Sequence, residues 1–356
     1  MDIEDFQLER WFARYEHESE IMLAESGIRS LDADMFDLDV GKLGYVIPTN
    51  GDPDFRERIG SRYHRGKDEV LLTCGTQEAN FLTYLSILGE GGHSVVVTPT
   101  YQALHSVPAA FGEVDKVWLE PSEWDLDVEK VKEAVKDDTK LIVLNNPNNP
   151  TGKYHPEDKV RALLDIAEDN DIYLHCDEVY RLLADDPIPP VASMSEEGIS
   201  TSSLTKSYGL AGARFGWIAG PKEIVERAWK WKDYTTISTS ALGQHIAKQA
   251  LGPMENEILN MNRKLAKENR NIVQNFLNEH GLGWFYPIGV NGFVTVPDNF
   301  EGSIEFCRKF VEEKSVVLAP GKLFGYDEYF RIGFGLPTDE LKEGLSRLEE
   351  FLQEHN

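Results

Sequence analysis

The feature of this chain that most constrains its fold is an alternation of short apolar runs with loops and helical segments. The apolar run 70–73 leads through Gly75 into a helical pattern, and comparable runs at 94–98, 141–144 and 172–176 each end in a polar loop. Runs this short and this apolar are typical of buried strands. Strands that alternate with helices indicate an α/β fold.

The length and composition allow two modest domains, or one large and one small. The chain has 356 residues, of which 41% are hydrophobic, so it can bury a sizeable core. Its formal net charge is −25. Such an acidic chain lacks the basic footprint of a nucleic-acid-binding protein and is repelled by anionic membrane surfaces. The acidity is compatible with high solubility or with a salty cell interior.

The cysteines and the apolar runs bear on the cell compartment. Cys74, Cys176 and Cys307 show no metal-binding spacing and cannot all pair, so a reducing cytoplasm is the simplest interpretation and no metal site is expected. The N-terminus is acidic and lacks the apolar core of a signal peptide. No apolar run approaches the roughly 20 residues of a membrane span. We therefore expect a cytoplasmic protein with no nucleic-acid or membrane partner.

A lysine in the stretch 201–214 is the strongest candidate for a catalytic residue. Lys206 lies among small and hydroxyl-bearing residues, with Ser203 three positions before it and Arg214 eight positions after it. A lysine that loses solvent and side-chain freedom can bond covalently to a carbonyl compound. Ser203 and Arg214 could hold a phosphate beside it. The alternative is a surface lysine in a glycine-rich loop.

This stretch resembles the lysine signature of the class I/II aminotransferases, which are pyridoxal-phosphate (PLP) enzymes of fold type I. The resemblance implies that Lys206 bonds covalently to PLP and that Ser203 and Arg214 bind its phosphate. It also implies the fold, which is a large domain with a mostly parallel seven-stranded sheet between helices, and a small α/β domain built from both termini.

Three more segments match the parts of this family's cofactor site. Thr76 and Gln77 begin the helix after Gly75, so their free N–H groups and the helix dipole favour an anion, as in the family's phosphate-binding cup. Tyr101 follows a buried strand and matches the aromatic residue that stacks on the cofactor ring. Tyr45 matches the tyrosine that reaches the cofactor phosphate of the partner subunit. A plain capped helix is the alternative for Thr76 and Gln77, and a tyrosine of the hydrophobic core is the alternative for Tyr101 and Tyr45.

Two polar loops match the family's contacts to the cofactor ring. The string Asn145-Asn-Pro-Asn-Asn-Pro-Thr-Gly152 follows a strand and forces an irregular loop. Its Asn149 matches the family's contact to the cofactor O3′ and to the substrate carboxylate. Asp177 ends the next strand, where a buried carboxylate needs a cation. The resemblance makes that cation the ring nitrogen and makes Tyr180 a donor to O3′, whereas a helix N-cap is the alternative for Asp177.

Two further residues match contacts to the substrate. Arg331, in the strand-like run 330–334, matches the arginine that binds the substrate α-carboxylate, with an exposed strand arginine as the alternative. Gly27 matches an N-terminal glycine that lies over the substrate, and we expect it to end a short strand in residues 21–28. An ordinary turn glycine is the alternative.

The resemblance implies a homodimeric amino-acid aminotransferase that uses PLP and passes an amino group to a 2-oxo acid. A PLP-dependent C–S/β-lyase or a cyclising synthase on the same scaffold is the nearest alternative. A PLP-binding regulatory domain is a second, but no basic helix-turn-helix segment precedes residue 45. We assign residues 45–250 to the large PLP-binding domain, and residues 1–44 with 251–356 to the small domain.

The sequence also bears on the amino donor. In aspartate-specific relatives, an arginine some way after the catalytic lysine pairs with the distal carboxylate, but the corresponding residues 233–244 contain no arginine or lysine. A carboxylate buried without a partner costs several kcal/mol, on the order of the penalty for removing one member of a buried ion pair. We therefore expect neutral or aromatic donors to be preferred over aspartate. Arg29 is the residue that could overturn this expectation.

Overall fold

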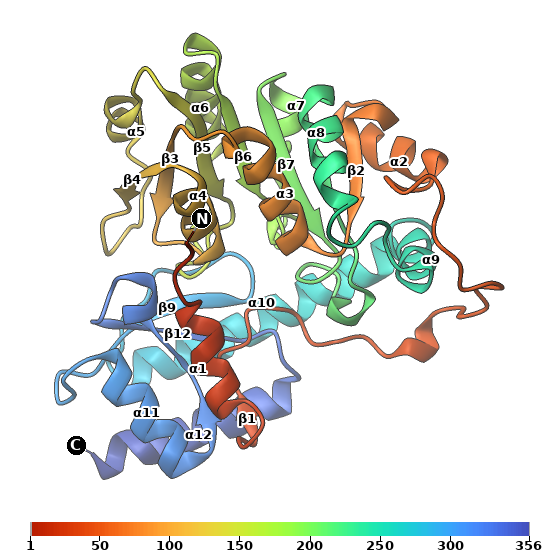
Figure 1. The fold of residues 1–356 in the computed structure, drawn as a ribbon. Coiled ribbons are helices and arrows are strands. Elements are labelled where there is room, and N and C mark those ends of the chain that lie inside the picture. Colours follow the sequence, from red (N-terminus) through yellow and green to blue (C-terminus); the bar gives the residue numbers. More distant parts are fainter. Residues whose placement is uncertain (1, 356) are drawn as a thin grey trace.

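A computed structural model describes the chain from residue 2 to residue 355. Its centre is a seven-stranded sheet with the order β2-β8-β7-β6-β5-β3-β4 (Figure 1). All neighbours in this sheet pair in parallel except β8, which is antiparallel to β2 and β7. The predicted α/β fold with a mostly parallel seven-stranded sheet is therefore confirmed. The strands are β2 (Val70–Thr73), β3 (His93–Thr98), β4 (Glu113–Trp118), β5 (Thr139–Asn145), β6 (Tyr173–Asp177), β7 (Gly198–Ser203) and β8 (Gly216–Ala219).

Helices cover both faces of this sheet because its strands are apolar on both sides. Val96 and Val143 pack against α3, α4 and α8, whereas their neighbours Val95 and Val97 pack against α5, α6 and α7. Successive strand residues point to opposite faces, so the two helix sets lie on opposite faces. The helices are α3 (Thr76–Leu88), α4 (Ala103–Phe111), α8 (Lys222–Lys232), α5 (Val128–Ala134), α6 (Glu157–Asp169) and α7 (Val191–Met194).

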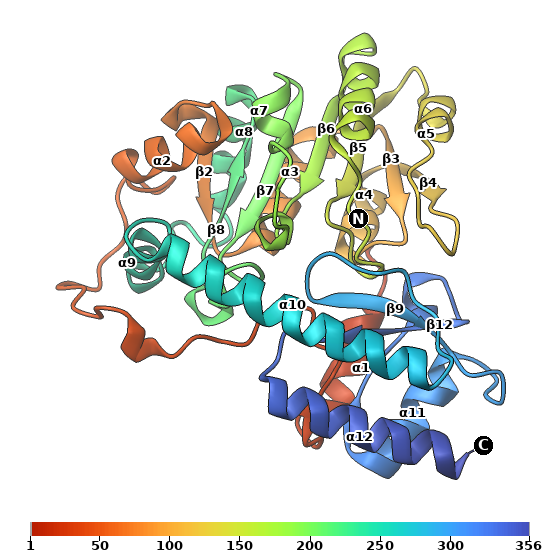
Figure 2. The ribbon, with the colours of Figure 1, turned by 180° about the vertical axis from the view of Figure 1, so that it is seen from behind.

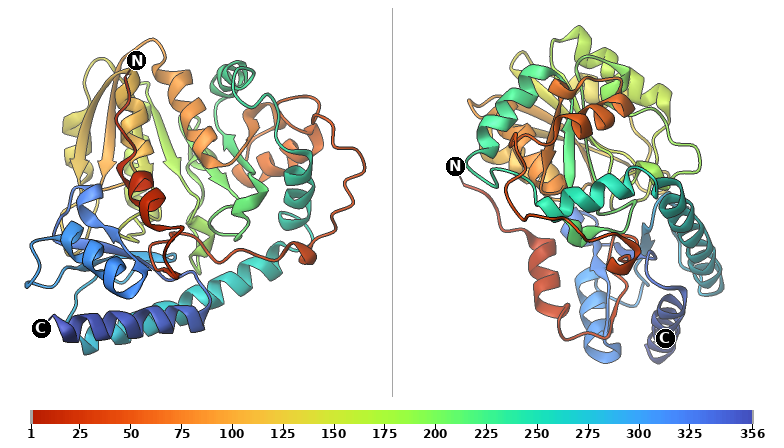
Figure 3. Two further views of the ribbon diagram at one scale, coloured as in Figure 1. Left: turned by 60° about the horizontal axis from the view of Figure 1, so that its bottom comes forward. Right: turned by 90° about the vertical axis from the view of Figure 1, so that its right-hand side faces the viewer.

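Segments from both ends of the chain form a second layered part beside the sheet. The long helix α10 runs along the back of the molecule from α9 toward this part (Figure 2). There, β11, β12 and β9 form an antiparallel sheet in the order β11-β12-β9, and β1 pairs in parallel with β10. Figure 3 shows the red N-terminal helix beside the blue C-terminal segments. The remaining elements are α1 (Gln7–Tyr15), β1 (Ile21–Met22), α2 (Pro53–Gly60), α9 (Ala241–Ala250), α10 (Glu255–Glu279), β9 (Asn291–Thr295), α11 (Ser303–Lys314), β10 (Val316–Val317), β11 (Ala319–Pro320), β12 (Tyr329–Gly333) and α12 (Thr338–Glu354). The domain boundaries given above stay a prediction.

The prediction of a strand in residues 21–28 was wrong except for its first two residues. Only Ile21–Met22 forms a strand, and the chain then continues without regular structure to Gly27. Its backbone groups instead bind the other end of the chain: the Leu23 carbonyl accepts a hydrogen bond from the Gly333 N–H at 2.6 Å. Pairing with a distant segment thus replaces the local strand.

The strand directions bring five loops to one edge of the sheet. Strands β2, β3, β5, β6 and β7 all run the same way, so their carboxyl ends meet at that edge. In the register, Asn145 lies beside Asp177 and Asp177 lies beside Thr201. Ligands of open α/β sheets bind at such an edge. No helix in residues 2–355 has both the length and the apolar character needed to cross a membrane.

Candidate active site

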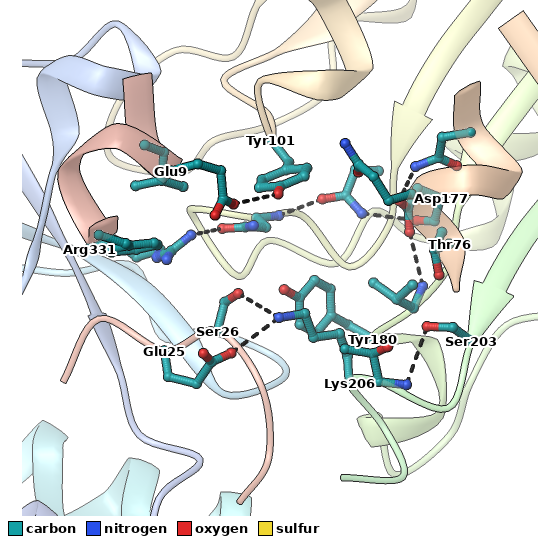
Figure 4. A pocket seen from close by; sticks show the side chains of 18 of the residues that line it. Glu9, Glu25, Ser26, Thr76, Tyr101, Asp177, Tyr180, Ser203, Lys206 and Arg331 are labelled. Carbon is teal, nitrogen blue, oxygen red and sulfur yellow. Dashed lines mark hydrogen bonds and ion pairs between the residues drawn. The ribbon is translucent and has the colours of Figure 1, made fainter. Parts of the chain in front are cut away.

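A pocket of about 280 Å³ lies between the carboxyl edge of the sheet and the segments α1 and β12. Side chains from both parts of the chain face one another across it (Figure 4). Ten of the residues predicted from the sequence line it, namely Thr76, Gln77, Tyr101, Asn149, Asp177, Tyr180, Ser203, Lys206, Arg214 and Arg331. Residues as distant in sequence as Thr76 and Arg331 therefore share one cavity.

Lys206 follows β7 and reaches across the pocket to the N-terminal arm. Its Nζ donates to Ser26 Oγ at 3.0 Å and to Glu25 Oε1 at 3.2 Å. Burial lowers the pKa of Lys206, but Tyr180 and Glu25 outweigh this effect, so the pKa lies above its ordinary value. The side chain is 22% exposed, so it is held in place yet open to the cavity. The surface-lysine alternative does not describe it.

Asp177 ends β6 with its carboxylate turned into the pocket, and it is not a helix N-cap. Oδ2 accepts from Asn80 Nδ2 at 2.8 Å, and Oδ1 accepts from the Val179 N–H at 3.2 Å. Burial raises the pKa of Asp177 to about 6, although both donors oppose that shift. A buried carboxylate of this kind is completed by a nearby cation.

Behind Asp177, a buried chain of hydrogen bonds fixes the orientation of Asn80. The Thr201 hydroxyl donates to Asn80 Oδ1 at 2.6 Å, so Thr201 must accept from His175 Nε2, which lies 2.8 Å away. His175 Nδ1 then accepts from the Tyr84 hydroxyl at 3.0 Å. Burial lowers the pKa of His175 to about 3, which keeps the ring neutral and this tautomer in place. Asn80 is thereby held with its N–H toward Asp177.

The start of α3 and the neighbouring loops form an anion-binding end of the pocket. Thr76 is the first residue of α3, and its buried Oγ1 has no partner within residues 2–355. Gly75, at φ +88°, allows the Arg214 guanidinium to approach, because a Cβ there would lie 2.7 Å from Arg214 Nη2. Free N–H groups, a hydroxyl and a guanidinium together suit a phosphate. Ser203, which is 1% exposed, lines the same pocket.

Arg331 forms the opposite end of the pocket, and it is 1% exposed rather than an exposed strand residue. Its Nη1 donates to Asn149 Oδ1 at 2.8 Å and its Nη2 to the Ala24 carbonyl at 2.7 Å. Its Nε has no acceptor among the described residues. A buried guanidinium with a donor to spare suits a carboxylate. Asn149 is fixed in turn, because its N–H donates to Asn145 Oδ1 at 2.7 Å.

Tyr101 lies on the α1 side of the pocket. Its hydroxyl donates to Glu9 Oε1 at 2.8 Å, and its ring contacts Phe6 with the centroids 5.0 Å apart. Burial, assisted by Glu9, raises the pKa of the Tyr101 hydroxyl far above its ordinary value, so it stays protonated. The ring is therefore anchored by α1 on one side and lines the pocket on the other.

Three further residues considered in the sequence do not line this pocket, namely Gly27, Tyr45 and Arg29. Gly27 is buried beside Lys206, since a Cβ on it would lie 3.7 Å from Lys206 Nζ. Tyr45 is 70% exposed on the surface of the chain, so it is not a core tyrosine. The Arg29 side chain lies against Met261 Sδ at 3.9 Å.

Sequence reasoning missed several pocket residues: Glu9, Glu16, Glu25, Ser26, Asn80 and Asn145. One of them carried a signal, because Asn80 stands between the apolar residues Ala79 and Phe81, and a polar residue that is buried needs a partner. Glu25 and Ser26 carried none. They reach the pocket only because the N-terminal arm pairs with the C-terminal strands.

The comparison with known families agrees with this geometry. The model of the family "Aminotransferase class I and II" matches residues 26–348, and the chain belongs to this family. It is therefore a PLP-dependent aminotransferase of fold type I, an enzyme that transfers the amino group of amino acids. The unpartnered Thr76 Oγ1, the Gly75 turn and buried Asp177 all fit PLP. Among residues 2–355, no group of three or more His, Cys, Asp or Glu side chains could hold a metal ion.

Individual relatives cover nearly the whole chain. It is 27% identical over 336 residues to a probable aspartate aminotransferase of Methanocaldococcus jannaschii, covering 89% of this chain and 87% of that protein. It is 28% identical over 316 residues to a capreomycidine synthase of Streptomyces vinaceus, covering 86% and 81%. The structure of a PLP-dependent aminotransferase from Streptococcus suis superposes with a TM-score of 0.94 at 29% identity, covering 100% and 99%. The PLP-dependent cyclase OrfR gives a TM-score of 0.89 at 26% identity, covering 100% and 99%.

Proposed function

We propose that Lys206 would hold PLP through a covalent bond and that its free amine would move the proton of the substrate α-carbon. PLP supplies the electron sink that takes up the charge left on that carbon. Asp177 holds the proton on the ring nitrogen, and Tyr180 and Asn149 donate to the ring oxygen. The observation that carries the proposal is one pocket containing Lys206, buried Asp177 and buried Arg331.

The remaining predicted residues bind the two ends of the reacting molecules. Thr76, Gln77, Ser203 and Arg214 hold the phosphate with N–H, hydroxyl and guanidinium donors. Arg331 and Asn149 bind the α-carboxylate, which the free Nε–H of Arg331 supports. Tyr101 stacks on the cofactor ring, and Gly27 leaves room for the substrate beside Lys206.

The partners follow from the family. We propose an amino acid as donor and a 2-oxo acid as acceptor, in a homodimer whose Tyr45 completes the phosphate site of the neighbouring subunit. The 70% exposure of Tyr45 supports a role outside its own chain. Three cysteines without disulfides agree with a cytoplasmic location.

We further propose that aspartate is a poor donor. Arg29, which could have paired with a distal carboxylate, lies against Met261, and Glu9 and Glu25 line the pocket instead. Their negative charge repels a second carboxylate on the substrate. Although several relatives are named aspartate aminotransferases, this pocket supports neutral, aromatic or cationic donors.

The test is a single-turnover measurement with the cofactor-loaded enzyme. Conversion of PLP to pyridoxamine phosphate is followed after mixing with aspartate, glutamate, phenylalanine or leucine. We expect aspartate and glutamate to react more slowly than the others. Conversion by aspartate at least as fast as by phenylalanine would contradict the substrate proposal. Because relatives include a cyclase and a synthase, a second outcome matters: product formed without pyridoxamine phosphate would indicate lyase or cyclase chemistry.

A further inference from the structure

Three glutamates of the N-terminal arm line the active-site pocket: Glu9, Glu16 and Glu25. Figure 4 shows Glu25 pointing toward Lys206, and Glu9 on the other side of Arg331. Glu25 Oε1 accepts from Lys206 Nζ at 3.2 Å, and Glu9 accepts from the Tyr101 hydroxyl. The positive charge of Lys206 has the largest effect on the pKa of Glu25 and lowers it below its ordinary value, so this carboxylate is charged.

If the proposed function holds, the other charged residues of the pocket each have a role in the chemistry, and these three glutamates have none. Arg214 faces the phosphate, Arg331 faces the substrate α-carboxylate, and Asp177 faces the ring nitrogen. Lys206, the cation that pairs with Glu25, is taken up by its bond to the cofactor. In that state Glu25 lines the pocket without its ion-pair partner.

Arg331 independently marks where a ligand binds, and Glu25 lies on the segment that contacts Arg331. Arg331 is 1% exposed, lines the pocket and has an Nε without an acceptor in residues 2–355. Glu25 directly follows Ala24, whose carbonyl accepts from Arg331 Nη2 at 2.7 Å. An amino acid held at Arg331 by its α-carboxylate therefore has its side chain within reach of the arm that carries Glu25.

We propose that the preferred amino donor carries a positively charged side chain, an amino or guanidino group, that pairs with Glu25. Glu9 adds negative potential on the other side of Arg331. This deepens the proposed function, on which it rests, and it places cationic donors ahead of the neutral and aromatic ones expected from the sequence. The Glu25 side chain is 55% exposed, so the pair is partly solvated and its effect on affinity is moderate.

The test compares two amino acids of nearly equal shape, L-arginine and L-citrulline, which differ in the charge of the terminal group. Their dissociation constants are measured by calorimetry on cofactor-loaded Lys206→Ala protein, which cannot turn over. We expect arginine to bind about tenfold more tightly than citrulline, as for one charge-assisted hydrogen bond. Adding Glu25→Gln should remove most of this preference, and Glu25→Asp, which keeps the charge, should retain part of it. Glu18→Gln removes the same charge from an exposed position on the same arm and should preserve the preference.

The outcomes separate this inference from the proposed function. Equal binding of arginine and citrulline would overturn the inference, and so would a preference that persists in Glu25→Gln. In both cases the wild-type enzyme would still convert PLP to pyridoxamine phosphate with other amino acids. If no amino acid changes the cofactor spectrum of the wild-type enzyme, the proposed function fails and the inference fails with it.

Discussion

At the scale of single residues, the site contains buried charged groups that the described chain does not fully pair. Asp177 illustrates this, because its carboxylate receives two hydrogen bonds but no cation from the described chain close enough to form an ion pair. The chain of Tyr84, His175, Thr201 and Asn80 presents an N–H to it and so favours the charged form. The protein thus holds a carboxylate ready for a cationic ring nitrogen.

The burial of Asp177 makes the free energy of unfolding depend on pH. The folded-state pKa of Asp177 is about 6, above the ordinary 3.8, so protonated Asp177 contributes stability that is complete below about pH 4. That contribution is lost as the pH rises through 6. In cofactor-free protein, the free energy of unfolding of Asp177→Asn relative to wild type should therefore rise by about 1–2 kcal/mol between pH 5 and pH 8.

Chemical denaturation at the two pH values measures this change. Asp165→Asn, which removes an exposed carboxylate on α6, is the control and should give the same difference from wild type at both pH values. A pH-independent difference for Asp177→Asn would contradict the assignment of a raised pKa.

At the scale of elements, the turn between β2 and α3 decides whether the phosphate end can form. Gly75→Ala would introduce a Cβ 2.7 Å from Arg214 Nη2, at a φ of +88° that disfavours alanine. We expect at least about a tenfold loss of PLP affinity, the equivalent of one charge-assisted contact. Gly41→Ala is the matched control, since Gly41 also has a positive φ (+64°), but a Cβ on it would have no atom of the described chain within 4 Å.

Fluorescence titration with PLP measures both affinities. The Gly41 variant should bind PLP as the wild type does. Unchanged affinity in the Gly75 variant would show that Arg214 does not need this close approach.

The elements that could be predicted from the sequence are those whose own residues form a recognisable pattern. Strands such as 141–144 are apolar and end at polar loops, so β5, β6, the loop residue Asn149 and the last residue of β6, Asp177, were predicted. The arm around Glu25 has no such pattern. Its position depends on contacts with Gly333 and Arg331, some three hundred positions away, and local sequence carries no information about them.

At the scale of the whole molecule, exposed apolar side chains gather on two segments away from the pocket. Leu43, Tyr45 and Ile47 are 76%, 70% and 80% exposed, and Tyr234 is 86% exposed. Exposed apolar groups of this size are typical of subunit interfaces. They support the proposed homodimer, in which each Tyr45 reaches the other subunit's site.

Mixing two impaired variants tests this arrangement. Tyr45→Phe and Lys206→Ala should each have little activity, but hybrid dimers contain one site with both native residues. We expect activity to reappear on mixing, up to about a quarter of the wild-type value per subunit if subunits exchange at random and each variant is otherwise intact. Absence of recovery, with exchange demonstrated by mass, would count against a shared site, as would a fully active monomer.

The most direct test of the proposed function is to identify the lysine that bonds to the cofactor. The PLP-loaded enzyme is treated with borohydride, which makes the bond permanent, and the peptides are then mapped by mass spectrometry. We expect a single adduct on the peptide that contains Lys206, with none in the Lys206→Ala variant. An adduct on another lysine, or a protein that takes up no PLP, would contradict it.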